Sequence, residues 1–288
     1  MAFSDRTSAL LEHFGRRDHD EISDAGRTKL LLYEETRPVA VLLFHGMSAT
    51  PQQFARFALD LHARGHNVVV PRLPAHGHRD RFTPALAHLH ARDLRAFAGK
   101  SIELAQGLGE RVVVAGFSLG GLLALWGAQH HAVARAVAIA PFLGISWMPL
   151  RLTAPFTDTI LRLPNFFGWW NPLIRDRSGP DYGYPRYASH AVAQALVLAR
   201  EVFAYAREEV AARELIVVTN AAESAVSNRA IRRLLRRLRA GAGCRLEHVV
   251  LSGIVPSHDI IEPSARPAIA ERVYPQLLEI IGKTLDQD

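Results

Sequence analysis

The chain has 288 residues, of which 49% are hydrophobic and 22% are charged, and its single cysteine is Cys244. One cysteine excludes a disulfide framework, and no apolar run approaches the roughly 18 residues of a membrane-spanning helix, so we expect no integral membrane segment. The formal net charge is +6, but the arginines are scattered along the chain, which favours solvated helix faces over a nucleic-acid partner.

The first 26 residues are polar and charged and lack the apolar stretch of a secretory signal. We therefore expect no export signal there. A single cysteine is also typical of a protein kept in a reducing compartment. Together these features predict a cytoplasmic protein.

Short apolar runs alternate with helical patterns along the chain. Strands are predicted over residues 30–33, 39–44, 68–70, 112–115, 136–140, 215–219 and 246–251. Helices are predicted over residues 52–64, 84–106, 119–130, 228–240 and 267–283. Several strands are apolar without alternation, as expected when both faces of a parallel sheet are covered. The pattern predicts an α/β fold with a mostly parallel sheet and helices on both faces.

The alternation of strands and helices is interrupted over residues 141–213. This segment contains many prolines, three of the four tryptophans and one helix-like stretch, 190–209. This is far longer than the roughly 2–6 residues that usually connect a helix and a strand. We interpret the segment as a cap inserted into a single domain. The core of that domain is then formed by residues 1–140 and 214–288.

The strand 112–115 runs into Gly116-Phe117-Ser118-Leu119-Gly120-Gly121, and a helix follows. A serine on a tight turn between a strand and a helix has its hydroxyl exposed. Gly116 and Gly120 are expected there because side chains at these positions would collide with neighbouring backbone. Ser118 is therefore the candidate nucleophile.

A base and an acid are expected on later loops. His258 follows the last predicted strand and can reach back over the sheet edge to Ser118 as general base. The loop 220–228 after the preceding strand contains one carboxylate, Glu223, which would accept the histidine Nδ1–H and stabilise the imidazolium. Asp259 is the backup acid, although adjacent residues rarely turn both side chains toward each other.

Two backbone amides are expected to form an oxyanion hole. One is the N–H of Leu119, directly after the nucleophile. The other is the N–H of Met47, in the loop after strand 39–44, where Gly46 allows a sharp turn. His45, at the strand exit, is expected to brace this loop by hydrogen bonding rather than to act as a base.

Two other motifs are interpreted as structural. The H-x-H-x-D spacing of residues 76–80 could hold a metal, but Arg81 follows directly and no later cluster completes a site, so we predict neither a metal nor a cofactor. The arginine-rich stretch 229–239 has an apolar stripe at helical spacing. It lacks the interleaved aromatic residues of a single-strand nucleic-acid platform, so we predict an amphipathic surface helix.

The motifs together resemble the α/β-hydrolase superfamily, in the serine aminopeptidase S33-like branch near monoacylglycerol lipases, lysophospholipases and carboxylesterases. The matching pieces, in the family's order, are Phe44-His45-Gly46, residues 71–77, residues 116–121, Val218-Thr219 with its acidic loop, and His258-Asp259. The resemblance implies an eight-stranded sheet, a substrate-setting cap, a triad of Ser118, Glu223 and His258, and an oxyanion hole at Met47 and Leu119. Glu223 departs from the family pattern, since relatives usually carry aspartate there.

The predicted function is hydrolysis of small-molecule carboxylic esters through an acyl-enzyme. Phe166, Trp169 and Trp170 in the cap are candidates for an apolar acyl pocket, the alternative being that they pack the cap onto the core. Three other functions stay open: amide or peptide hydrolysis on the same triad, acyl transfer, and a non-catalytic binding protein on this scaffold. The oligomeric state is open as well.

Overall fold

The computed structural model describes residues 3–177, 179–241, 243–254, 256–262 and 267–282. Within them, one seven-stranded sheet has the order β1-β3-β2-β4-β5-β8-β9, and only β1 is antiparallel to its neighbour. Its strands are β1 (Lys29–Leu31), β2 (Arg37–Phe44), β3 (Asn67–Val70), β4 (Gly109–Phe117), β5 (Arg135–Ile139), β8 (Glu214–Asn220) and β9 (Arg245–Leu251). All seven predicted strands are present, with shifts of a few residues at their ends.

Eight α-helices are described. They are α1 (Phe3–Gly15), α2 (Ala55–Ala63), α3 (Ala91–Ala105), α4 (Leu119–His130), α5 (Leu150–Arg162), α6 (Ser189–Ala204), α7 (Asn228–Gly241) and α8 (Pro267–Gly282). Lys283, the last residue of one predicted helix, lies outside the described residues. None of the described helices combines the length and apolarity needed to cross a bilayer.

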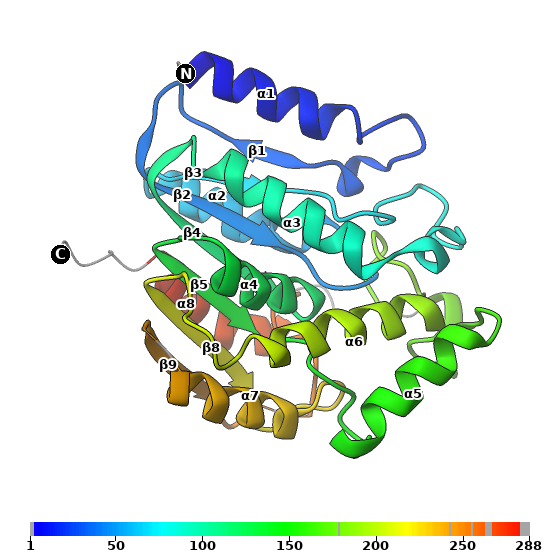
Figure 1. The fold of residues 1–288 in the computed structure, drawn as a ribbon. Coiled ribbons are helices and arrows are strands. Elements are labelled where there is room, and N and C mark those ends of the chain that lie inside the picture. Colours follow the sequence, from blue (N-terminus) through cyan, green and yellow to red (C-terminus); the bar gives the residue numbers. More distant parts are fainter. Residues whose placement is uncertain (1–2, 178, 242, 255, 263–266, 283–288) are drawn as a thin grey trace.

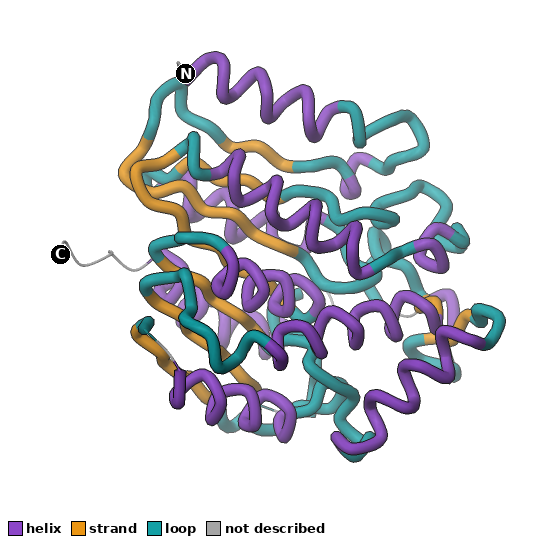
Figure 2. Tube along the Cα trace, in the orientation of Figure 1, coloured by secondary structure: helices purple, strands orange, loops and turns teal. Residues whose placement is uncertain are grey.

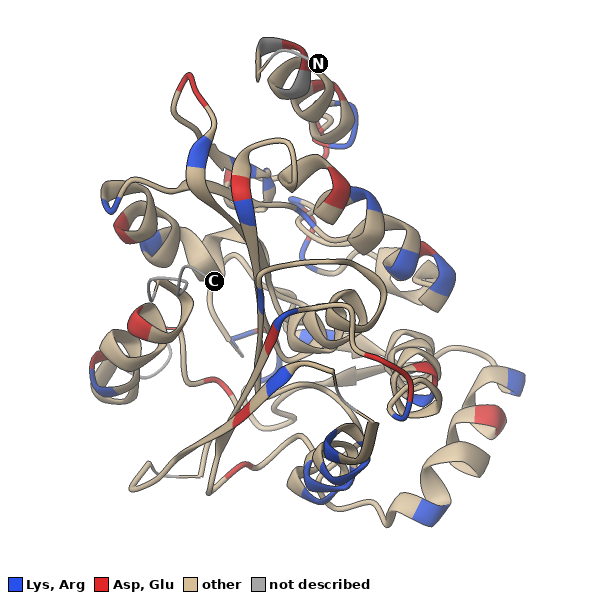
Figure 3. Ribbon diagram, turned by 60° about the vertical axis from the view of Figure 1, so that its left-hand side comes forward, with Lys and Arg blue, Asp and Glu red and all other residues tan. Residues whose placement is uncertain are grey.

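The sheet lies between two layers of helices (Figures 1 and 3). Helices α2 and α8 cover one face, where the tilted rings of Phe57 and Tyr274 pack with centroids 4.1 Å apart, and α3 and α4 cover the other. Strand β5 is buried along its whole length, as expected of a parallel strand covered on both faces. The α/β fold with a mostly parallel sheet is therefore confirmed.

The family resemblance implied eight strands, and seven strands of this sheet are described. The chain before β1 contains helix α1. Leu10 and Phe14 of α1 are buried at a spacing of four residues, which is the spacing of one helix face. Phe14 packs edge-to-face against Phe97 of α3, so α1 packs against α3.

One predicted helix, 84–106, is divided into a short 3₁₀ helix (Ala85–His88) and α3. The backbone of Leu89 and His90 between them is extended. The Ala91 N–H at the start of α3 donates to the Gln194 side chain of α6 at 3.0 Å. A side chain from a distant segment therefore stabilises the start of α3. The hydrophobic periodicity of residues 84–106 cannot predict such a contact.

The segment between β5 and β8 contains α5, α6 and a two-stranded ribbon of β6 (Phe167–Trp169) and β7 (Arg186–Ala188). Figures 1 and 2 show α6 between α4 and α5, with α5 farthest from the sheet. Tyr184 joins the segment to the core: its N–H donates to Ser48 O at 2.7 Å and its hydroxyl to Ala75 O at 3.2 Å. The segment therefore sits over the loops that leave the carboxyl edge of the sheet.

Candidate active site

Ser118 lies at the junction of β4 and α4 with φ 55° and ψ −110°, a conformation that costs energy for a residue with a Cβ. The turn is close-packed. A Cβ on Gly116 would lie 2.2 Å from Gly120 O, and a Cβ on Gly120 would lie 1.9 Å from Phe44 O. The predicted reason for both glycines is confirmed, and the turn holds the serine side chain away from its own strand.

Two consecutive hydrogen bonds connect Ser118, His258 and Glu223. His258 Nε2 lies 2.8 Å from Ser118 Oγ, and His258 Nδ1 lies 3.0 Å from Glu223 Oε1. An ionised carboxylate only accepts hydrogen bonds, so Nδ1 carries the proton and donates to Glu223. This tautomer leaves the Nε2 lone pair to accept the Ser118 hydroxyl proton, which is the arrangement a general base requires.

The Glu223 side chain is 1% exposed, and its Oε1 also accepts the N–H groups of Ala225 at 2.8 Å and Val226 at 3.2 Å. Burial by itself raises the pKa of Glu223, but the hydrogen bond and charge of His258 and the two amides outweigh burial, so the pKa lies below its usual value. The carboxylate is therefore ionised at neutral pH and fixed in position by its own loop.

The loop of His258 is held from two sides. The Phe117 ring lies against the His258 ring with centroids 4.9 Å apart, and Asn220 Nδ2 donates to Ser257 O at 2.8 Å. Asp259, the backup acid, uses its Oδ1 to accept the N–H groups of Ile261 and Glu262, and burial raises its pKa. Glu223, not Asp259, contacts the imidazole.

Met47 and Leu119 line the same cavity as Ser118. Leu119 is the first residue of α4, so its N–H has no acceptor within the helix. In the described part of the chain, neither amide donates a hydrogen bond to another group. Both residues therefore line the cavity with a backbone N–H that has no acceptor among the described residues.

Gln53 is a residue that the sequence analysis missed. Its Oε1 accepts the Gly46 N–H at 2.9 Å, and its side chain lowers the pKa of Asp259, with which it lines the same cavity. It therefore holds the loop of Met47 and acts on the loop of His258. The left-handed residue of the Met47 loop is Ser48, with φ 63°, and not Gly46, where a Cβ would lie 3.2 Å from the Phe117 ring.

His45 braces the same loop, as predicted. Its Nε2 accepts the Leu73 N–H at 3.1 Å, so its Nδ1 donates to Gly46 O at 2.9 Å. Burial, and then the neighbouring His76, hold the pKa of His45 well below its ordinary value. The ring is therefore neutral and fully used in structural hydrogen bonds.

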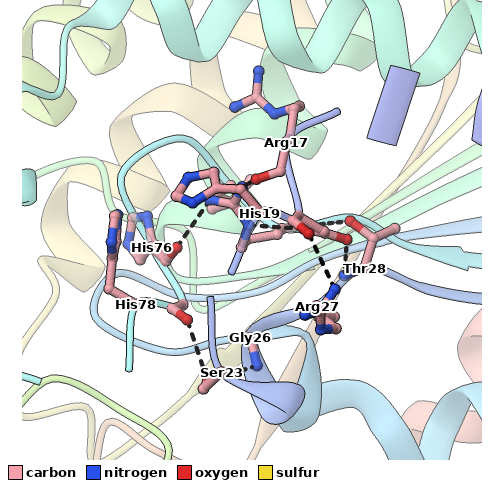
Figure 4. A network of polar contacts seen from close by, with 12 residues as sticks. Arg17, His19, Ser23, Gly26, Arg27, Thr28, His76 and His78 are labelled. Carbon is pink, nitrogen blue, oxygen red and sulfur yellow. Dashed lines mark hydrogen bonds and ion pairs between the residues drawn. The ribbon is translucent and has the colours of Figure 1, made fainter. Parts of the chain in front are cut away.

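His76 and His78 lie in the polar network of Figure 4 that joins residues 17–28 to the loop after β3. Burial lowers the pKa of His76 to about 4, and its Nδ1 donates to Pro74 O. The Arg72 guanidinium pairs with Asp18 at 2.9 Å in the same network. In the part of the chain that is described, no group of three or more His, Cys, Asp and Glu side chains is arranged to hold a metal.

A cavity of about 540 Å³ opens above Ser118 and His258. Much of its wall is aromatic, contributed by Phe117, Phe142, Trp147, Phe156, Phe166, Trp170, Tyr184 and Tyr187. Of the three predicted pocket residues, Phe166 and Trp170 line it and Trp169 does not. Trp169 packs edge-to-face on Phe82 instead. Successive side chains of the β6 region point to opposite faces, so 166 and 170 share a face that 169 does not.

Residues 41–268 match the model of the alpha/beta hydrolase family. A thermostable monoacylglycerol lipase from Bacillus sp. (strain H-257) is 31% identical over 105 residues, which is 34% of this chain and 38% of that lipase.

Solved structures share the fold across most of the chain. The monoacylglycerol lipase of Paleococcus ferrophilus superposes with a TM-score of 0.63 at 17% identity, over 86% of this chain and 96% of that one. A soluble variant of monoglyceride lipase from Saccharomyces cerevisiae, in complex with a substrate analogue, gives 0.64 at 12% identity, over 91% and 92%. A structure reported with two metagenome-derived lipolytic enzymes gives 0.65 at 17% identity, over 90% and 99%.

Proposed function

The chain belongs to the alpha/beta hydrolase family, of the lipase and esterase type, and from this premise we propose that it hydrolyses carboxylic esters through an acyl-enzyme on Ser118. The observation that carries the proposal is the row of Ser118 Oγ, His258 Nε2 and Nδ1, and Glu223 Oε1, with spacings of 2.8 and 3.0 Å. A nucleophile within reach of a base that is itself oriented by a carboxylate is the arrangement for acyl transfer.

In the proposed mechanism, His258 Nε2 takes the proton of the Ser118 hydroxyl as its oxygen attacks the ester carbonyl. The N–H groups of Met47 and Leu119 hold the oxyanion, each contributing about 3–4 kcal/mol to the transition state. His258 then gives its proton to the departing alcohol. Water, deprotonated by the same imidazole, attacks the acyl-enzyme and releases the acid, while Glu223 stabilises the imidazolium in both halves.

The proposed substrate is an ester with an aliphatic acyl group. The cavity above Ser118 is lined by aromatic rings and by aliphatic side chains such as Ile160 and Val192, and an apolar site of this size suits an alkyl chain. The relatives include monoacylglycerol lipases, and a monoacylglycerol is the substrate that we propose. In this proposal residues 141–213 act as a cap on a core of 1–140 and 214–288.

The test is hydrolysis of p-nitrophenyl esters of increasing chain length by the wild type and by Ser118→Ala. We expect the alanine variant to lose roughly 10⁵–10⁶-fold in kcat, with an unchanged melting temperature. Retained hydrolysis in Ser118→Ala would overturn the mechanism. A fluorophosphonate probe that leaves Ser118 of the folded wild type unlabelled would favour a non-catalytic protein, and faster cleavage of aminoacyl-arylamides than of esters would favour an amidase.

A cytoplasmic location completes the proposal. Its support is the single cysteine, Cys244, because a chain with one cysteine forms no internal disulfide framework of the kind found in oxidising compartments. Fractionation of cells that express the full-length chain tests this location directly.

A further inference from the structure

A second cavity, of about 340 Å³, lies between α5, α6 and α7. It shares helices α5 and α6 with the cavity above Ser118 but no lining residue. Phe156 and Ile160 of α5 line the first cavity, whereas Leu150 and Ala154 line the second. Its volume is at the lower end of the roughly 300–1,000 Å³ of small-molecule sites.

The second cavity combines an apolar wall with cationic groups. Its aliphatic and aromatic lining is Leu143, Leu150, Ala154, Leu196, Ala199, Phe203 and Ala204. The charged side chains are Arg200, Arg233 and Arg237, and among the described residues that line it none is acidic. An apolar wall with one sign of charge is typical of a site for an amphiphile of the opposite charge.

The three arginines differ in what they already bind. Arg200 pairs with Asp158 at 2.8 Å, and Arg237 donates one N–H to Phe203 O at 3.1 Å while its guanidinium lies over the Phe203 ring. Within the described residues Arg233 has no ion pair or hydrogen bond. Guanidinium groups bind carboxylates through paired N–H groups, so Arg233 and the remaining donors of Arg237 can hold one.

Two further features favour an anion at this place. The hydroxyl oxygen of Thr153, on the cavity wall, is buried without a hydrogen-bond partner in the described part of the chain. Helix α7 also carries Arg229, Arg232, Arg236 and Arg239 outside the cavity, and it is the helix with the densest blue in Figure 3. The helix therefore attracts anions to the mouth of an apolar cavity.

We propose that the cavity between α5, α6 and α7 is a second binding site that takes the carboxylate of an unbranched aliphatic acid, with the alkyl chain against Leu150, Leu196 and Phe203. Arg233 and Arg237 hold the carboxylate. The inference rests on the proposed function only for the source of this ligand, since ester hydrolysis at Ser118 releases such an acid. Binding itself needs no turnover.

The test is calorimetric titration of the Ser118→Ala chain with sodium decanoate. We expect Arg233→Gln/Arg237→Gln to weaken decanoate binding at least tenfold, and the matched pair Arg232→Gln/Arg236→Gln, on the same helix but outside the cavity, to change it less than twofold. Because no residue lines both cavities, any binding of decanoate beside Ser118 contributes equally to the two double variants. Decanol and acetate, which lack the charge and the chain respectively, should bind at least tenfold more weakly.

A second variant guards against a loss of structure at Arg237. Ala154→Leu fills the cavity from α5 without removing a charge, and we expect it to abolish the arginine-dependent binding while the melting temperature is kept. Equal effects of the two arginine pairs, or decanol binding as tightly as decanoate, would overturn the proposal. The proposal would also be overturned if the chain bound anionic phospholipid vesicles through Arg233 and Arg237 but did not bind decanoate. If the wild type hydrolyses no ester but the chain still binds decanoate, the proposed function is wrong and the second binding site stands.

Discussion

The Gln53 side chain accepts the Gly46 N–H at 2.9 Å and lowers the pKa of Asp259, so one buried amide acts on both of the loops that meet at Ser118. One of these loops carries Met47 and the other carries His258. Their relative position depends on this amide as well as on the strands from which they leave. A residue that touches no reacting atom is thereby expected to influence the geometry of the site.

Replacement of Gln53 by alanine tests this link. Gln53→Ala leaves the Gly46 N–H buried and unpaired, which costs about 1–3 kcal/mol, and it frees the Met47 loop to shift. We expect kcat/KM for a p-nitrophenyl ester to fall by roughly 10- to 100-fold, because small misplacements of catalytic groups are costly. Gln52→Ala, at its exposed neighbour, is the control, and equal losses in the two variants would contradict the link.

Replacement of Glu223 separates its charge from its shape. Glu223→Gln keeps the side-chain length but removes the charge that stabilises the imidazolium, and we expect kcat to fall by roughly 10³–10⁴-fold. Glu223→Asp keeps the charge on a side chain one methylene shorter and should lose less. Asp259→Asn is the comparison, since Asp259 accepts backbone amides, and a larger loss there than in Glu223→Gln would reassign the acid.

The pKa of Glu223 also predicts how stability depends on pH. The folded-state pKa lies below its ordinary value, so the unfolded chain takes up a proton first as the pH falls. The stabilisation is complete above the unfolded value of about 4.3 and is lost as the pH falls below it toward the folded value. We expect the melting temperature of the wild type to fall more steeply below pH 5 than that of Glu223→Gln, and parallel curves would count against this.

The elbow at Ser118 predicts a large effect from one methyl group. A Cβ at position 120 would lie 1.9 Å from the Phe44 carbonyl oxygen and 2.7 Å from the His45 carbonyl oxygen. Both oxygens are backbone atoms, so they cannot move without disturbing the end of β2. Gly120→Ala is therefore expected to cost more than about 4 kcal/mol or to prevent folding, as measured by chemical denaturation. Gly15→Ala, where nothing lies within 4 Å, should be almost neutral, and a stable, active Gly120→Ala protein would refute the close packing.

The features that the sequence predicted correctly are those that a local hydrophobic pattern determines. All seven strands of the sheet were predicted because they are short apolar runs between turn residues, and parallel strands direct their following loops to one edge. That edge brings Ser118, Glu223 and His258 together from positions far apart in the chain. The order of the motifs therefore carried most of the information about the site.

The missed features depend on partners distant in sequence. Helix α5 was not predicted because Pro155 interrupts its pattern. Proline lacks a backbone N–H and so removes one helical hydrogen bond, but packing against α6 stabilises the helix despite this loss. Gln53 gave no signal because its role comes from two loops that meet only in the folded chain. The orientation of Trp169 follows from the pairing of β6 with β7, which composition alone does not specify.

The proposed acyl pocket predicts opposite shifts in chain-length preference from two changes at one position. Val192 of α6 lines the cavity above Ser118. Val192→Trp removes volume from the roughly 540 Å³ available, so the ester chain length with the highest kcat/KM should shorten. Val192→Ala adds volume and should lengthen it, because each buried methylene contributes about 0.8 kcal/mol to binding only where the cavity admits it. The measurement is kcat/KM across p-nitrophenyl esters from acetate to palmitate. A uniform loss at every length, or shifts in the same direction for both variants, would show that the acyl chain lies elsewhere.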